Sequence, residues 1–205
     1  DNCTMTIVYE TKKMTELFPV VEGEEDRTAE ETDPLMEIVH LATSATGVDQ
    51  LHNQTYIRLQ AVYRDLVDCW MVTARDDAAS NKLVGVFGFG DLNNFGALAR
   101  SGGGWRNTVR DAIVAKGIDD DADVDVSCAI YVHEDYKGQN IASTMRNKRQ
   151  EYQLNRGITH SLVLSPATDN IKTWNDMVNT RLGGETIGTD SDGNNIYLCP
   201  HGTSL

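Results

Sequence analysis

Apolar residues recur along the chain with two spacings, and the change from one spacing to the other marks the expected elements. Residues 6–11 alternate between apolar and polar side chains, which is typical of a short strand. A helical stripe is expected over 33–47, where Pro34 takes the first helical position after an aspartate cap and Gly47 provides the stop. A second helical stripe follows over 49–66. The first third of the chain therefore predicts one strand and two helices.

The rest of the chain alternates strand and helix patterns around turn signals. The expected segments are an antiparallel hairpin over 69–77 and 82–92, a strand over 124–132, a helix over 140–156, a strand over 160–169, a helix over 170–184 and a final hairpin over 185–200. A strand, a helix and a strand in succession imply two parallel neighbours joined by a right-handed crossover. We therefore expect a mixed α/β fold built on one mixed sheet with flanking helices.

Two segments stand apart within what we expect to be a single domain over 1–205. Residues 16–34 are strongly acidic and predict a loop-rich surface segment. Residues 95–122 contain a triple glycine that lacks the Gly-Lys-Ser/Thr continuation of a nucleotide-hydrolase phosphate loop. We interpret 95–122 as a flexible insertion with a short helical stretch over 108–117.

Composition and charge narrow the classes of function. The net charge of −13 argues against nucleic acid as the partner, because phosphate binding needs a basic surface. The chain has no apolar run long enough to span a membrane, and its first residues lack the pattern of a secretory signal. The four cysteines are scattered and predict reduced thiols in a cytoplasmic protein. No metal site is expected, because the acidic turn at 190–194 has its glycine too early for a calcium loop.

One stretch of the acidic chain is basic. Residues 137–156 carry five basic side chains and one acidic side chain, Glu151. A solvated helix face would have this composition, and so would a surface that attracts an anion.

The turn that opens this stretch has the residues of an anion-binding loop. The sequence YVHEDYKGQNIAST, residues 131–144, runs from a strand through Lys137 and Gly138 into a helix. The first backbone N–H groups of a helix lack partners and lie at the positive end of its dipole, which suits a diphosphate. Gly138 has no Cβ to obstruct a phosphate, Lys137 adds a positive charge, and Asn140 tolerates a left-handed backbone. The same turn could also serve only as a connection.

The turn and its surroundings resemble the acyl-CoA-binding motif of the GCN5-related N-acetyltransferases, the GNAT superfamily. In that motif an aliphatic strand leads into Arg/Gln-x-x-Gly-x-Gly/Ala, and here Lys137, Asn140 and Ala142 take the three defined places. Further along, Asn170 and the Leu182-Gly183 pair match the family's next strand and helix. The resemblance covers about residues 124–188. It implies a sheet whose central parallel pair splays apart, so that the backbone of 129–132 pairs with the pantetheine arm.

The resemblance implies acetyl-CoA as a co-substrate and a set of residues that hold it. These residues are Tyr131, Val132, Lys137, Gly138, Gln139, Asn140, Ile141, Ala142, Ser143 and Asn170.

The catalytic half of the family pattern is less complete than the binding half. Asn179 stands where the family often places a tyrosine general acid, and Val124 where it often places a glutamate general base. His133, the titrating group nearest the motif at neutral pH, is the candidate catalytic base, and an ordinary loop histidine is the alternative. Tyr131, Glu134 and Tyr136 are further candidates.

Two functions are consistent with this sequence. The first is an acyl-CoA-dependent N-acyltransferase in which a primary amine attacks the thioester directly, and the acidic surface favours a cationic acceptor. The second is a catalytically inactive GNAT-fold protein that serves as a structural or binding component of a larger assembly, such as a virus particle. In that case the acidic segment 16–34 and the insertion 95–122 are candidate contact surfaces for protein partners.

Overall fold

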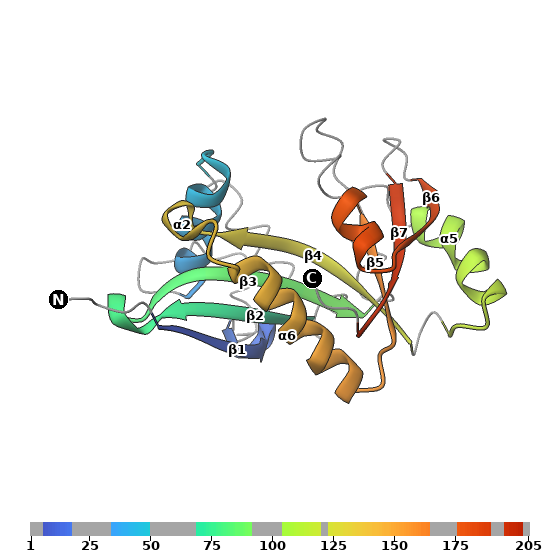
Figure 1. The fold of residues 1–205 in the computed structure, drawn as a ribbon, viewed down its shortest axis with the longest axis horizontal. Coiled ribbons are helices and arrows are strands. Elements are labelled where there is room, and N and C mark those ends of the chain that lie inside the picture. Colours follow the sequence, from blue (N-terminus) through green and yellow to red (C-terminus); the bar gives the residue numbers. More distant parts are fainter. Residues whose placement is uncertain are drawn as a thin grey trace, which may run out of the picture. The chain divides into compact units, whose positions relative to one another are not determined.

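A computed structural model describes residues 6–17, 34–49, 69–91, 104–119, 123–164, 176–189 and 195–202. Within these residues, seven strands form one mixed sheet in the order β1-β2-β3-β4-β5-β7-β6 (Figure 1). The elements are β1 (Ile7–Lys13), α1 (Met14–Leu17), α2 (Pro34–Thr46), β2 (Cys69–Asp76), η3 (Asp77–Ala79), β3 (Lys82–Asp91), α5 (Gly104–Ala115), β4 (Val124–Val132), η4 (Glu134–Tyr136), α6 (Ile141–Asn155), β5 (His160–Leu164), β6 (Glu185–Thr189) and β7 (Asn195–Pro200). Residues 176–181 are also helical.

The sheet contains the predicted mixture of strand directions. β1 and β2 are antiparallel, and so are the pairs β5–β7 and β6–β7. β4 and β5 are parallel, with Val124–Val126 paired to His160–Leu162. The last residues of β4, Tyr131 and Val132, lie beyond this paired stretch. The prediction of a mixed α/β fold on one sheet is confirmed.

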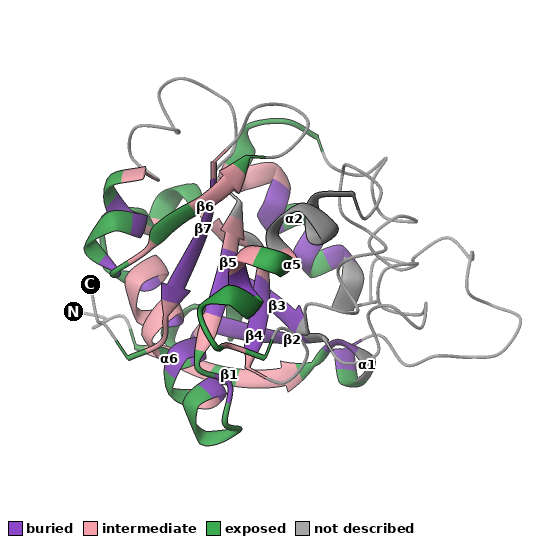
Figure 2. Ribbon diagram, turned by 90° about the vertical axis from the view of Figure 1, so that its right-hand side faces the viewer, coloured by how far each residue is buried: buried purple, intermediate pink, exposed green. Residues whose placement is uncertain are grey.

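The contacts divide the chain into two units, which we describe in turn. The first unit comprises residues 1–89 and 128–149. Its strands β2 and β3 are almost entirely buried (Figure 2). The first half of α6 packs closely on β3 at Gly85, where a Cβ would lie 3.0 Å from Ile141 Cγ2 and 3.1 Å from Met145 Sδ. A glycine at this position lets the helix and the strand approach each other.

Residues 90–127 and 150–205 form the second unit. Its core brings together α5, the start of β4, β5 and β7, through Ile113, Val124, Val126, Leu162, Ile196 and Leu198. A fully buried carboxylate, Asp125, adjoins this core and accepts a hydrogen bond of 2.7 Å from Gln153 Nε2. His201 Nε2 lies 3.3 Å from the same carboxylate oxygen. A buried charge needs such partners, because burial removes its hydration.

Part of the segment 95–122, which we interpreted as a flexible insertion, is a helix with a buried side chain. Helix α5 begins at Gly104, four residues before the predicted helical stretch, and its Ile113 is fully buried in the core. The triple glycine concealed this start, because glycine disfavours a helix interior. Residues 92–103 and 120–122 lie outside the described part of the chain.

Other predictions fall partly or wholly outside the described residues. The second helix over 49–66, most of the acidic segment 16–34 and the acidic turn at 190–194 belong to this group, and the single domain over 1–205 stays a prediction. No helix in the described ranges is long and apolar enough to cross a bilayer. Nor does the described part of the chain gather three or more potential metal ligands of the His, Cys, Asp or Glu type. Cys199 is a buried thiol that forms no disulfide with another described residue.

Candidate functional site

The candidate site is the loop between β4 and α6, which lies wholly within the first unit. The loop begins at His133, whose backbone N–H donates to the carbonyl of Val84 on β3 over 2.8 Å. The single turn η4 follows and is closed by two backbone bonds, from Tyr136 N to His133 O at 2.9 Å and from Lys137 N to Glu134 O at 3.3 Å. These bonds fix the direction in which the chain leaves the strand.

Two residues in the loop have a left-handed backbone. Gly138 has φ of +80°, and an added Cβ would find nothing within 4 Å, so the space beside it is open. Asn140 has φ of +60° and immediately precedes α6. Glycine adopts this conformation without steric cost, and asparagine is one of the few other residues that tolerates it. The left-handed conformation considered for Asn140 from the sequence is confirmed, and Gly138 adopts it as well.

The backbone amides of residues 138–143 have no acceptor among the residues that the structure describes. The first amide of the helix with a backbone acceptor is that of Thr144, which donates to Asn140 O at 3.0 Å, and the Thr144 hydroxyl donates to the same oxygen at 2.7 Å. Within the described residues, none of the N–H groups of 138–143 donates a hydrogen bond. Residues 137–140 are exposed to solvent. Six amide donors without an acceptor among the described residues thus lie at the positive end of a helix, and the space beside one of them, that of Gly138, is open.

The C-terminal end of α2 holds the loop from one side. The Ser44 hydroxyl accepts a hydrogen bond of 3.2 Å from the backbone N–H of Glu134, and the Lys137 ammonium donates to the carbonyl of Ala45 at 3.3 Å. An ammonium has three N–H donors, so Lys137 keeps further donors after this bond. Lys137 therefore provides a positive charge at the loop, as predicted, and also anchors the loop to α2.

Tyr136 anchors the loop to the β2–β3 hairpin. Its hydroxyl donates to Asp76 Oδ2 over 2.5 Å, while Asp76 Oδ1 accepts from the backbone N–H of Ala78 at 3.1 Å. Asp76 is buried at the end of β2. The hydrogen bond to this carboxylate, together with burial, raises the pKa of Tyr136 above its usual value. The phenol therefore remains protonated and donating near neutral pH.

The predicted catalytic base, His133, has a structural role in the loop. Its Nδ1 accepts a hydrogen bond of 3.1 Å from the backbone N–H of Asp135 and so caps η4. The ring also contacts Tyr136 edge-to-face at 5.8 Å between centroids. Because Nδ1 accepts, the neutral imidazole carries its proton on Nε2. In this arrangement His133 is a capping residue, and its role as a base stays a prediction.

The other predicted site residues have clear positions. Tyr131 and Val132 end β4 and are half-buried, Ile141 is buried against β3, and Ala142 and Ser143 are half-buried in the first turn of α6. Asn170 lies outside the described residues.

The two departures from the family pattern are both buried. Val124 belongs to the core of the second unit. Asn179 is buried, and its backbone carbonyl accepts from Gly184 N at 2.8 Å. Neither side chain carries a titrating group, as the sequence analysis noted for both positions.

The residues that the sequence did not reveal are the loop's supports. Ser44, Asp76 and Val84 hold the loop through contacts between segments 49 or more residues apart. Of these three residues, only Asp76 lies beside a feature that the sequence predicts, the turn of the β2–β3 hairpin. That feature predicts the turn and does not predict a contact with the β4–α6 loop.

The sequence by itself matches neither a protein-family model nor a curated protein sequence. The fold, however, matches solved structures over nearly the whole chain. A PaiA N-acetyltransferase from Thermoplasma acidophilum, solved in complex with coenzyme A, is similar with a TM-score of 0.56 and 12% identity, covering 96% of this chain and 99% of that one. The chain has the GNAT fold.

Two further structures agree with this assignment. The ribosomal-protein-S18-alanine N-acetyltransferase from Escherichia coli has a TM-score of 0.55 and 11% identity, covering 97% of each chain. The GNAT-family protein YhbS from Escherichia coli, in complex with CoA, has a TM-score of 0.56 and 12% identity, covering 98% of this chain and 85% of that one. At such identities the similarity establishes the fold. The loop of 133–140 follows β4 of this GNAT fold, which is where the sequence motif predicted the acyl-CoA site.

Proposed function

We propose that the chain binds acyl-CoA at the β4–α6 loop and transfers the acyl group to a primary amine. The observation that carries this proposal is the set of six backbone N–H groups, from Gly138 to Ser143, that donate to no other described residue. Unpaired amides at a helix start, beside open space and next to an ammonium, suit a diphosphate. Two of the solved GNAT neighbours contain coenzyme A, which supports the same ligand class.

In this proposal each part of the loop has a separate task. The amides of 138–143 and the Lys137 ammonium hold the diphosphate, while the backbone of Tyr131 and Val132 directs the pantetheine arm along the end of β4. The amine nitrogen attacks the thioester carbonyl, a C–N bond forms, the C–S bond breaks and the thiolate leaves. The amine gives its proton to solvent or to a nearby base such as His133. Holding amine and thioester together supplies much of the acceleration, because the thioester is already activated.

The charge of the chain bears on the acceptor and the setting. With a net charge of −13, the surface attracts cations, so a cationic amine acceptor is favoured. We place the protein inside a cell, where acetyl-CoA is available and the Cys199 thiol stays reduced. Asn179 and Val124 provide neither general acid nor general base, which keeps the alternative of a binding protein without catalysis as the second candidate.

Thermal unfolding with and without acetyl-CoA tests the site. Ligand at a hundred times its dissociation constant should stabilise the folded chain by about 2.7 kcal/mol. The variant Gly138→Val should lose this stabilisation, because its side chain enters the open space beside the amides. Gly157→Val is the matched control, since Gly157 follows the other end of α6 with φ of +82° and equally open surroundings.

Without ligand, both variants should lose a similar amount of stability, because each places a valine where the backbone has a positive φ. Only Gly157→Val should keep the stabilisation by acetyl-CoA. An unmodified chain that shows no shift, or a Gly138→Val chain that shifts as much as the control, would refute binding at this loop. Acetylation of a polyamine by the unmodified chain then separates transfer from binding alone.

A further inference from the structure

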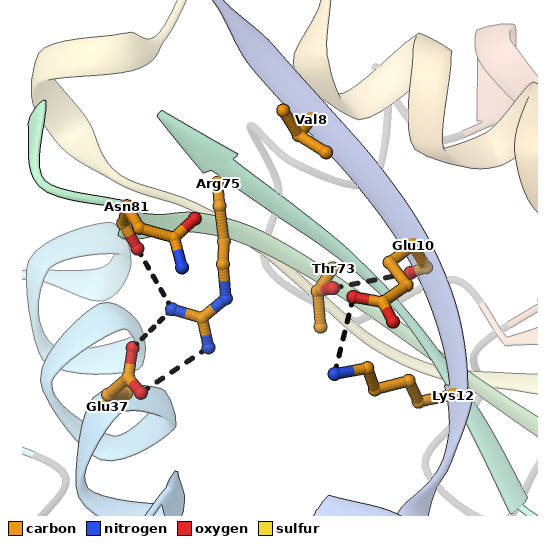
Figure 3. Close-up of a pocket in the computed structure, with 7 residues that line it drawn as sticks. All are labelled: Val8, Glu10, Lys12, Glu37, Thr73, Arg75 and Asn81. Carbon is orange, nitrogen blue, oxygen red and sulfur yellow. Dashed lines mark hydrogen bonds and ion pairs between the residues drawn. The ribbon is translucent and has the colours of Figure 1, made fainter. Parts of the chain in front are cut away.

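A concave site away from the β4–α6 loop lies in the first unit, on the face of the β1–β2 ladder that α2 adjoins. It is a cavity of about 320 Å³ (Figure 3). Its lining residues are Val8, Glu10, Lys12, Glu37, Thr73, Arg75 and Asn81. The proposed function above makes no use of these residues.

The register of β1 and β2 explains why this face is polar. Glu10 pairs with Thr73 and Val8 pairs with Arg75, so these side chains project from the same face of the ladder. Thr73 is buried at the floor, and its hydroxyl donates to the carbonyl of Glu10 at 3.3 Å. A sheet face beside a helix usually carries apolar side chains that the helix buries. Here it carries charges that stay partly open to solvent.

Arg75 presents an unused pair of donors to this cavity. Its Nη1 donates to Glu37 Oε2 at 2.6 Å and to Asn81 O at 3.1 Å, and its Nη2 donates to Glu37 Oε1 at 3.4 Å. A guanidinium has five N–H groups, so Nε–H and one N–H of Nη2 remain without an acceptor among the described residues. Figure 3 shows the Nε edge of the guanidinium turned toward the side of the cavity where Glu10 and Lys12 lie. Two parallel donors on one edge match a carboxylate.

Glu10 presents a negatively charged hydrogen-bond acceptor, in contrast to the positively charged donors of Arg75. Its Oε2 lies 3.3 Å from Lys12 Nζ, and its other carboxylate oxygen has no partner among the described residues. The Glu10 side chain is 57% exposed, so an incoming group can reach it. A free carboxylate oxygen accepts hydrogen bonds from an ammonium.

We propose that this cavity binds a small zwitterion with separated charges, of the ω-amino acid or dipeptide kind. The ligand carboxylate accepts from Nε and Nη2 of Arg75, and the ligand ammonium donates to Glu10. The two ion pairs leave the lining without net charge, so a lone cation meets Lys12 and Arg75 while a lone anion meets Glu10 and Glu37. A zwitterion satisfies both unused groups and keeps the existing ion pairs. The inference stands independently of acyl-CoA binding.

Three probes of matched shape test this inference: 4-aminobutanoate, butylamine and butanoate. We expect 4-aminobutanoate to bind at millimolar concentration, to shift the Arg75 Nε–H resonance in a nitrogen-15 NMR spectrum, and to bind at least about tenfold more tightly than either singly charged probe. Similar affinity for all three probes, or an unchanged Arg75 Nε–H resonance, would overturn the proposal.

Variants locate the ammonium site. Glu10→Gln should weaken binding of 4-aminobutanoate about five- to tenfold, because a charged acceptor becomes neutral. Glu185→Gln is the matched control: Glu185 is similarly exposed and pairs with Lys116 at 2.7 Å in the second unit. Glu10→Gln binding as tightly as the control contradicts the assignment. Since Glu10 is exposed, both variants should fold, which the dispersion of their NMR spectra checks.

Discussion

At the scale of single residues, the shape of the loop between β4 and α6 depends as much on the residues that support it as on its own backbone. Asp76 is buried and uses one oxygen for Ala78 N and the other for Tyr136. The sequence drew attention to Gly138, which has no Cβ, and to Asn140, which tolerates a left-handed backbone, because both properties belong to the residue itself. It did not predict the contact between Asp76 and Tyr136, because that contact depends on how distant segments pack.

Tyr136→Phe should lower the free energy of unfolding by about 1 kcal/mol, because it removes a hydrogen bond to a buried carboxylate. It should also weaken acetyl-CoA binding, because the loop loses its anchor to the hairpin. Tyr197→Phe is the control, since the Tyr197 hydroxyl donates to Asp176 Oδ1 at 2.7 Å in the second unit. Isothermal titration calorimetry should show weaker binding for Tyr136→Phe alone. Equal binding by both variants would remove Tyr136 from the positioning of the loop.

The loss of stability in Tyr136→Phe and in Tyr197→Phe should depend on pH. The hydrogen bond to Asp76 raises the pKa of Tyr136, and burial followed by the bond to Asp176 raises that of Tyr197. A raised folded-state pKa means that the contribution to stability is complete below the unfolded value of about 10 and is lost as the pH rises through the folded value. Denaturant unfolding should therefore show each stability difference from the unmodified chain shrinking above about pH 10. A difference that stays constant there would contradict a neutral phenol donor.

At the scale of elements, helices and strands were predicted correctly where the residues that indicate them are adjacent in the sequence. The hairpin of β2 and β3, the strand β4 and helix α6 were predicted within about one residue of their bounds, because apolar period and turn residues coincide in each. The start of α5 was missed, since Gly104 opposes a helix locally and core contacts of Ile113 outweigh that preference. The burial of Asp125 was equally hidden, because its partners Gln153 and His201 come from distant segments.

The approach of α6 to β3 depends on the missing side chain at Gly85. Gly85→Val should lower the free energy of unfolding by about 1–3 kcal/mol, because its methyl groups collide with Ile141 and Met145. Denaturant titration measures this loss. Adding Met145→Ala should cost less in the Gly85→Val chain than in the unmodified chain, since the space it opens relieves the collision. Strictly additive effects would show that the two positions do not meet.

At the scale of the whole molecule, stability should decline in mild acid. Burial lowers the pKa of His160 below its usual value, the nearby His201 lowers it further, and Asp123 acts in the opposite direction. The unfolded chain then binds a proton before the folded chain does, so folding loses free energy as the pH falls below about 6.5. His160→Gln should reduce the slope of unfolding free energy against pH between about 7 and 5. His40→Gln, an exposed change on α2, is the comparison; equal slopes in both variants would contradict this role.

The two units are interleaved along the sequence, and this affects how the chain can fold during its synthesis. The polypeptide leaves the first unit after residue 89, returns at residue 128 and leaves again after residue 149. Severing the backbone at any single peptide bond therefore yields no fragment that contains one complete unit and nothing else. On the ribosome, residues 1–89 must wait until residue 149 has emerged before their unit is whole, and the other unit closes only when β7 is synthesised.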